Sequence, residues 1–300
     1  MRAVRFEQYG GPEVLEIAEV EEPHAGPGRV RIRVHAAGVN AADWKLREGL
    51  MAKGPLTGPH GVGLDAAGVV DEVGEGVAGV RVGDRVFGSG SATFAEYAVL
   101  TAWAELPRHV PFDEGAAAPV PVDTAIRVLD AVEARKGDTL VISGAAGGVG
   151  TALIQIARAR GLIVIGVASA ANQEYVQALG ALSTTYDDGW VQRVRDLAVG
   201  EVDVAADLAG AGVIAQLIEL TGDPSRVVSI ADASAAELGA KTTFGGGDKA
   251  AALREAARLM ESGALRMIVE ETYPLEQTPE AQRVSKEGHG RGRAVVEVHR

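Results

Sequence analysis

A glycine-rich segment in the middle of the chain has the residue types and spacing that bind a dinucleotide pyrophosphate. Residues 144–150 read Gly-Ala-Ala-Gly-Gly-Val-Gly and follow a short apolar, β-branched run at 138–143. A helical pattern comes next and stops at Gly161, and a second apolar run begins at Leu162. In such a βαβ unit the glycines let the backbone approach the phosphates, and helix N–H groups point at the negative charge.

A turn that binds nothing is the alternative interpretation, because glycines also serve tight turns without a ligand. Ala145 stands where the usual G-x-G-x-x-G pattern has its first glycine, so the segment matches a variant of that pattern. The strand before it and the helix after it favour nucleotide binding.

The composition is that of an ordinary globular protein, and it excludes several kinds of partner and site. The 300 residues are enough for two domains, with 47% hydrophobic and 23% charged residues. A formal net charge of −12 disfavours nucleic acid or an anionic membrane as a partner. The absence of cysteine excludes disulfides and thiolate zinc sites. No secretory signal or membrane-spanning run is found, so we expect a cytoplasmic protein that acts on a small molecule.

Two parts of the chain follow different patterns. Up to about residue 117, alternating strands such as 14–20 and 29–35 are separated by glycine and proline turns, which predicts a compact β-barrel. From about 119 to 267, strands and helices alternate, which predicts a doubly wound parallel sheet. The strand-like run 293–298 is expected to rejoin the first part. The predicted fold class is therefore α/β, with a β-barrel domain beside the parallel sheet.

Six motifs occur in a fixed order along nearly the whole chain. They lie at 37–45 (AGVNAADWK), 63–70 (GLDAAGVV), 83–87 (GDRVF), 94–97 (FAEY), 144–150 and 288–293 (GHGRGR). Together they resemble the medium-chain dehydrogenase/reductase superfamily, in its zinc-free, zeta-crystallin-like quinone oxidoreductase branch. The resemblance implies a GroES-like catalytic domain at 1–117, completed by 272–300, and a Rossmann dinucleotide-binding domain at 118–271. It also implies an NADPH-dependent reductase with its active site between the two domains.

The positions that hold catalytic zinc in relatives carry the wrong side chains here. They match Asn40, Leu64 and Val120, and one amide with two aliphatic groups cannot supply the nitrogen and sulfur donors that Zn²⁺ requires. The six histidines are scattered, at 24, 35, 60, 109, 289 and 299, and form no close pair along the sequence. We therefore expect no metal site.

Four neighbouring residues are the predicted catalytic residues: Asn40, Asp43, Trp44 and Lys45. Without a metal, reduction of a quinone or an activated alkene relies on the nicotinamide for hydride and on protein donors to stabilise charge on oxygen. Asn40 is expected to donate to a substrate or ribose oxygen, or only to its own turn. Trp44 is either an apolar wall or a buried structural residue, and Asp43 either orients its neighbours or caps a helix. Lys45 either polarises an oxygen or is simply exposed.

Several cofactor contacts follow from the resemblance. Thr124 matches a position beside the nicotinamide ring, or caps a helix, and Arg293 stands where the family often has lysine. Ser229 and Asp207, with Ala209 just beyond it, end predicted strands at the edge where such sheets bind ligands, or are ordinary strand ends. The full predicted set is Thr124, Ala145, Ala146, Gly147, Gly148, Val149, Ser169, Asn172, Tyr186, Ala209, Ser229 and Arg293.

The sequence after the second strand of the βαβ unit favours NADPH over NADH. NAD-binding folds place Asp or Glu about twenty residues after the glycine turn, to bind the ribose 2′-hydroxyl. Ser169 holds this place, so no carboxylate repels a 2′-phosphate. Ser169, Asn172 and Tyr186 match positions that contact this phosphate in NADPH-using relatives, although Ala170 and Ala171 stand where a basic residue often helps.

Three functions are compatible with these features. The first is an NADPH-dependent quinone or enone reductase, the second an enoyl-thioester reductase on the same scaffold, and the third a non-catalytic NADPH-binding protein. The resemblance also implies a homodimer through edge strands of the nucleotide-binding domain, with 226–231 as the expected contributor.

Overall fold

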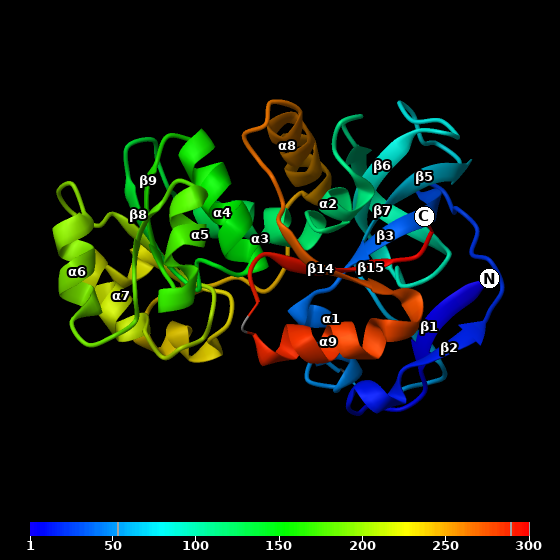
Figure 1. The fold of residues 1–300 in the computed structure, drawn as a ribbon, viewed down its shortest axis with the longest axis horizontal. Coiled ribbons are helices and arrows are strands. Elements are labelled where there is room, and N and C mark those ends of the chain that lie inside the picture. The colour runs from blue at the N-terminus through cyan, green and yellow to red at the C-terminus, as the bar shows by residue number, and fades with distance from the viewer. Residues whose placement is uncertain (53, 289, 300) are drawn as a thin grey trace. The chain divides into compact units, whose positions relative to one another are not determined.

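The computed structural model describes residues 1–52, 54–288 and 290–299. By its contacts the chain divides into two compact units, a barrel unit of residues 1–120 and 249–300 and a sheet unit of residues 121–248 (Figure 1). The segment 249–271, expected in the dinucleotide-binding domain, falls in the barrel unit by this division. The reason is that helix α8 (Lys249–Glu261) packs against strand β7 (Tyr97–Glu105).

The barrel is built from a six-stranded sheet in the order β14-β15-β3-β5-β6-β7, and an additional pairing of β3 with β7 closes four of these strands into a ring. Val30, Ile32 and Val34 alternate with polar residues along β3 and are fully buried, as the two-residue period of a strand requires. Besides β7, the strands are β3 (Val30–Gly38), β5 (Asp65–Val73), β6 (Arg85–Ser91), β14 (Val269–Pro274) and β15 (Arg293–Glu297).

Both ends of the sequence contribute to the barrel unit. Strand β15 pairs antiparallel with β3 and parallel with β14, so the last strand of the chain lies beside one of the first. Figure 1 shows this pairing as the red strand next to the blue one. The expectation that 293–298 rejoins the first part of the chain is therefore confirmed.

Short elements complete the barrel unit. A three-stranded antiparallel sheet has the order β2-β1-β4, and helices α1 and α9 pack against each other. The elements are β1 (Arg2–Phe6), η1 (Pro12–Val14), β2 (Glu16–Glu19), α1 (Ala41–Arg47), β4 (His60–Gly61), α2 (Phe112–Ala116), η5 (Leu275–Gln277) and α9 (Thr278–Glu287), where η denotes a 3-10 helix.

A parallel sheet in the order β10-β9-β8-β11-β12-β13 forms the sheet unit. All five residues of β8 are buried, as expected for a central strand covered on both faces. Helix α4 packs against β9, and α7 packs against β11 and β12. The strands are β8 (Thr139–Ser143), β9 (Ile163–Val167), β10 (Leu182–Thr184), β11 (Val204–Asp207), β12 (Val227–Ser229) and β13 (Lys241–Thr242).

Helix α3 (Pro119–Ala131) precedes the first of these strands. The helices between the strands are α4 (Gly148–Ala159), η2 (Ala170–Asn172), α5 (Gln173–Ala178), α6 (Trp190–Leu197), α7 (Ile214–Thr221), η3 (Pro224–Arg226) and η4 (Ala233–Leu238). The predicted fold class, a doubly wound parallel sheet with a β-barrel, is confirmed. Among the described residues, no helix combines the length and apolar character needed to cross a bilayer.

One expectation about the sheet edge is wrong. Strand β12, within the segment 226–231, was expected to offer a free edge to a partner copy, but it pairs with β11 on one side and β13 on the other. The edge on this side of the sheet is the two-residue strand β13. The homodimer itself stays a prediction.

Removing a large side chain from the barrel core should strongly destabilise the protein. Phe94 is fully buried within the barrel core cluster, so Phe94→Ala should lower the free energy of unfolding by about 3–5 kcal/mol. Leu50, which is 67% exposed, provides the control, and Leu50→Ala should change it by less than about 0.5 kcal/mol. Denaturant unfolding measures both, and a Phe94→Ala loss no larger than the control's would contradict this assignment of the core.

Candidate active site

The glycine turn lies between β8 and α4, as the sequence predicts. Gly144 has φ of +83°, which favours glycine, and Gly147 is the N-cap of α4 with extended backbone. A Cβ on Gly150 would lie 2.4 Å from the carbonyl oxygen of Ala145, so only glycine fits this close approach. A Cβ on Gly147 would meet no atom closer than 3.7 Å, so the surface over the start of the helix is open. First-turn N–H groups have no partner within a helix, and an anion can accept from them here.

The five turn residues predicted to hold the cofactor divide by exposure. Ala145 and Ala146 are buried, and Gly147 is exposed, whereas Gly148 and Val149 are half-buried. Ala145 takes up space against β9, because a Cβ on Gly166 would lie 2.8 Å from the Ala145 methyl group. The alanine that replaces the first glycine is therefore a packing residue, and the open part of the turn begins at Gly147.

Tyr186 lies at the glycine turn. Its hydroxyl accepts a hydrogen bond from the N–H of Gly144 at 2.7 Å. Burial raises the pKa of this hydroxyl, although the hydrogen bonds at Gly144 and Ser143 oppose the shift. The side chain is 36% exposed, so one part of it remains open to a ligand.

Ser169 precedes the short helix η2 that follows β9, and Asn172 is the last residue of that helix. Ser169 is exposed and makes no capping hydrogen bond, and Asn172 is half-buried at the start of α5. The nearby Arg193 donates to oxygens of Thr184, Thr185, Asp187 and Asp188, so it serves the loop before α6. No carboxylate follows directly on β9, which fits a 2′-phosphate better than a bidentate ribose contact.

The strand ends at β11 and β12 are joined by hydrogen bonds. Asp207 is fully buried and accepts from the N–H groups of Ala209 and Gly210 at 3.2 and 3.1 Å. Its other oxygen accepts from the hydroxyl of Ser229 at 2.8 Å. Ser229 in turn accepts from the N–H of Asp232 at 2.9 Å. These groups fix the two loops at the carboxyl edge of the sheet, and a direct contact of Ala209 or Ser229 with a cofactor stays a prediction.

Thr124 lies inside α3 and does not cap it, because the helix begins at Pro119. Its hydroxyl oxygen accepts from Arg127 at 3.1 Å, which leaves the hydroxyl proton available to a ligand. Arg127 also donates to Thr243 and pairs with Asp123 at 3.1 Å. The guanidinium therefore holds α3 to the segment after β13.

A buried polar cluster in the barrel unit unites three predicted residues with one that was not predicted. The cluster consists of Asn40, Asp43, Asp65 and Arg293, and all four are buried or nearly so. Nη2 of Arg293 donates to the side-chain oxygen of Asn40 at 2.7 Å and lies 3.9 Å from an Asp65 carboxylate oxygen. The Asn40 amide nitrogen donates to Asp65 at 3.0 Å and to the carbonyl of Gly38 at 3.3 Å. In this state both N–H donors of Asn40 serve the protein, which favours the structural alternative for its nitrogen.

Asp43 is the third residue of α1, and Asn40 is the N-cap. The Asp43 carboxylate accepts a hydrogen bond from the backbone N–H of Asn40 at 2.7 Å, which satisfies a donor at the start of the helix. Burial raises the pKa of Asp43 to about 8, and the charge of Asp65 adds to the effect. Burial likewise raises the pKa of Asp65 to about 6, although Arg293 and the hydrogen bond from Asn40 oppose it. Burial lowers the pKa of Arg293.

Trp44 and Lys45 lie next to each other at the surface of α1. The Lys45 ammonium lies 5.4 Å from the centre of the Trp44 ring, and that of Lys286 lies 5.7 Å from it. The ring therefore holds two cations, at distances where an aromatic face attracts them. The Trp44 Nε1 is buried and has no hydrogen-bond partner among the described residues.

Asp65 is the functional candidate that the sequence interpretation missed. It directly follows Leu64 in the motif at 63–70, and a carboxylate at the start of a strand with a buried pattern was the available signal. One of its oxygens accepts from Asn40 and, at 3.0 Å, from the N–H of Val120. It therefore links three segments of the barrel unit.

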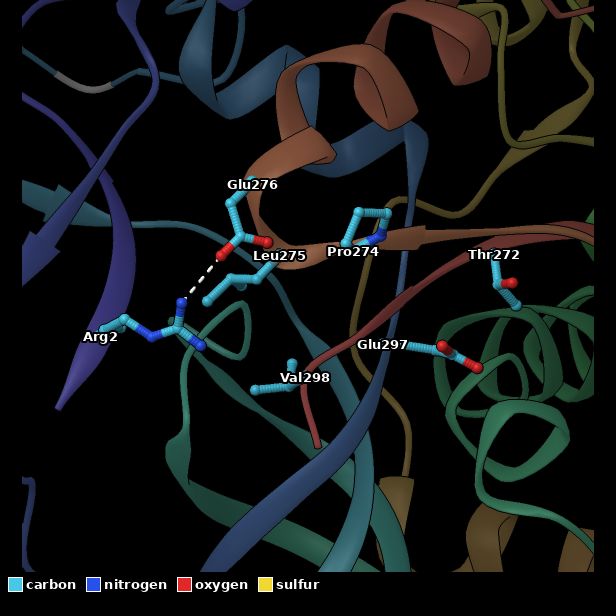
Figure 2. Close-up of a pocket in the computed structure, with 7 residues that line it drawn as sticks. All are labelled: Arg2, Thr272, Pro274, Leu275, Glu276, Glu297 and Val298. Carbon is cyan, nitrogen blue, oxygen red and sulfur yellow. Dashed lines mark hydrogen bonds and ion pairs between the residues drawn. The ribbon is translucent and has the colours of Figure 1, made fainter. Parts of the chain in front are cut away.

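A pocket of about 360 Å³ lies elsewhere in the barrel unit (Figure 2). Arg2 at its mouth pairs with Glu276 at 2.8 Å and with Glu96 at 3.0 Å, so its charge is already compensated. The lining contains none of the predicted site residues: Arg2, Thr272, Pro274, Leu275, Glu276, Glu297 and Val298. We assign no part of the reaction to it.

The described residues offer no cluster suited to a metal ion. Within residues 1–52, 54–288 and 290–299, no group of three or more His, Asp or Glu side chains is arranged to hold one. Asn40, at a position where relatives have a zinc ligand, has its amide engaged by Asp65 and Arg293. This donor set does not fit Zn²⁺. His289, which belongs to the motif at 288–293, lies outside the described residues.

Two family models match the chain. Residues 26–109 match the alcohol dehydrogenase GroES-like domain, and residues 179–296 match the zinc-binding dehydrogenase family. The chain is 31% identical to human quinone oxidoreductase, over 97% of this chain and 95% of that protein.

Solved structures show the same fold over the full length. The quinone oxidoreductase of Coxiella burnetii is 28% identical with a TM-score of 0.84, and the match covers 100% of this chain and 99% of that one. A mycobacterial protein solved in complex with NADPH is 26% identical with a TM-score of 0.86, and the match covers 99% and 100% of the two chains.

These matches agree with two features of the structure. One is the glycine turn on a parallel sheet, and the other is the barrel completed by the last strand. The chain belongs to the medium-chain dehydrogenase/reductase superfamily, in its quinone oxidoreductase branch.

Proposed function

We propose that this protein is an NADPH-dependent reductase that transfers hydride to a quinone or an α,β-unsaturated carbonyl compound without zinc. The single observation that carries the proposal is the open glycine turn at the start of α4, in a βαβ unit whose second strand, β9, is followed by Ser169 and not by a carboxylate. Membership of the quinone oxidoreductase branch supports the reaction class. The solved mycobacterial relative with NADPH supports the choice of cofactor.

The turn fits a dinucleotide by its backbone. A diphosphate would accept from the first-turn N–H groups at Gly148 and Val149, above the open surface at Gly147. Ser169, Asn172 and Tyr186 would hold the 2′-phosphate end. Thr124, Ala209 and Ser229 would hold the nicotinamide end, and bound NADPH would supply the hydride, while a contact of Arg293 with the cofactor stays a prediction. The proposed division of labour places dinucleotide binding in the sheet unit and substrate orientation in the barrel unit.

The substrate's reduction also requires stabilisation of negative charge on oxygen. Arg293 carries the buried positive charge of the proposed site, and its Nε has no partner among the described residues. Trp44 offers an aromatic surface with the Lys45 ammonium beside it, whereas the second cation there, Lys286, pairs with Glu48 at 2.8 Å. A planar, electron-poor quinone suits an aromatic surface, and Lys45 favours the anion that forms on reduction.

The proposed reaction is tested by following NADPH absorbance with a panel of acceptors. We expect turnover with quinones or α,β-unsaturated carbonyl compounds, and little with saturated aldehydes or ketones. Turnover confined to enoyl thioesters would instead identify an enoyl-thioester reductase. Stoichiometric NADPH binding with no oxidation across the panel would identify a binding protein and refute the proposed enzyme.

A carboxylate placed after β9 should reverse the cofactor preference. Ser169→Asp would repel a 2′-phosphate and offer a partner to a ribose hydroxyl. We expect the Kd of NADPH to rise at least tenfold, or about 1.4 kcal/mol, while that of NADH stays equal or falls. Ser169→Asn is the uncharged control, and calorimetric titration measures all four constants. Equal Kd values for NADPH in the Asp and Asn variants would contradict this placement of the 2′-phosphate.

A further inference from the structure

The buried cluster of Asn40, Asp43, Asp65 and Arg293 contains two carboxylates and only one cation. Their exposed fractions are 1% for Asn40 and Asp43 and zero for Asp65, and the Arg293 side chain is 9% exposed. One oxygen of Asp43 and one of Asp65 are buried with no hydrogen-bond partner among the described residues. A buried, ionised carboxylate without full compensation is costly. Two ionised carboxylates facing one guanidinium would leave an excess negative charge inside the barrel unit.

The other charged groups nearby do not remove this excess. Lys249, at the start of α8, is exposed and lowers the pKa of Asp65 only weakly, as the last of its causes. Helix α2 packs against β3, β5 and β15, but its buried Glu114 accepts from the N–H of Met267 and pairs with Arg266. Arg293 is thus the compensating cation for both aspartates.

Asp65 fixes the orientation of its neighbours. The same oxygen of Asp65 accepts from the Asn40 amide nitrogen and from the Val120 N–H, each at 3.0 Å. The Asn40 amide is thereby turned so that its oxygen faces Arg293, which donates to it at 2.7 Å. Reversing the Asn40 amide would set N–H groups against the guanidinium, so only one orientation is compatible with both neighbours.

We propose that Asp65 is a positioning residue that holds Asn40 and Arg293 in one arrangement, and that Asp43 and Asp65 together retain one proton at neutral pH. The retained proton leaves one negative charge for the one positive charge of Arg293. The proposal rests on the proposed function only in giving Arg293 a role at the cofactor. The proton and the arrangement are properties of the cluster itself.

The retained proton is tested by proton linkage of unfolding. Asp43 has its pKa raised to about 8, so the native state keeps a proton that the unfolded chain releases near pH 4. Stability from this group is complete below the unfolded pKa and is lost as the pH rises through 8. Between pH 5 and 7, the slope of the unfolding free energy against pH gives the number of protons that the native state holds beyond the unfolded state. This number should be about one lower in Asp43→Asn than in the wild type.

Two further variants give this test a direction and a control. Arg293→Met removes the cation, so the native cluster should retain about one proton more than the wild type near pH 7. Asp71→Asn, on the same strand as Asp65, alters a carboxylate that pairs with Arg31 and is 28% exposed, and should leave the proton count unchanged. Equal slopes in the wild type and Asp43→Asn would overturn the retained proton.

The positioning role is tested by the Asn40 side-chain amide signal in ¹⁵N NMR, identified by its loss in Asn40→Ser. In the wild type this signal should be sharp and should shift as the pH is raised through 8. In Asp65→Asn it should move or broaden, and the Kd of NADPH should rise about tenfold. Asp71→Asn should change neither.

The outcomes separate the two proposals. An unchanged Asn40 signal in Asp65→Asn would overturn the positioning role whatever the activity of the enzyme. If Asp65→Asn fails to fold, an Asn40 amide signal that is broadened in the wild type at neutral pH overturns it instead, because a fixed amide gives a sharp signal. A wild-type protein that shows the retained proton and the titrating signal but never oxidises NADPH would refute the proposed function alone.

Discussion

The hydrogen bond from Arg293 to Asn40 joins the last strand of the chain to the segment that follows β3. This contact reinforces the strand pairing that joins the two ends of the sequence, because β15 lies between β14 and β3. The same contact sets the charge of the interior, since Arg293 is the cation that faces both Asp43 and Asp65. Replacing Arg293 would therefore change both the connection between β15 and the segment after β3 and the charge of the buried cluster.

The parts of the fold with strong periodicity could be predicted from the sequence. The βαβ unit corresponds to β8, α4 and β9 within a few residues, because buried parallel strands read as continuous apolar runs. Strand β14 was not predicted, since four of its six residues are exposed and it lacks an alternating pattern. The edge strand β13 has only two residues, too few for any periodic signal, and its absence from the prediction led to the wrong sheet edge.

Three of the four residues in the buried cluster were named from the sequence, but the hydrogen bonds between them were not foreseen. Asn40, Asp43 and Arg293 lie in motifs and were named. A motif does not say which side chains will hydrogen-bond to each other and so have no donor left for a ligand. The amide of Asn40 was expected to donate either to a ligand or to its own turn, and Gly38 and the unforeseen Asp65 take both of its N–H groups. Such a partnership depends on strand pairing between β3 and β5, which brings Gly38 opposite Asp65. Local pattern carries no information on that register.

The division of the chain has a consequence for how the protein forms during synthesis. The sheet unit is one continuous segment, residues 121–248, whereas the barrel unit needs residues from before and after it. On the ribosome the sheet unit can therefore fold as soon as it has emerged, while residues 36–38 of β3 still lack their partner strand β15. The nascent chain is most exposed to aggregation in this interval, and the pairing of β15 with β3 ends it.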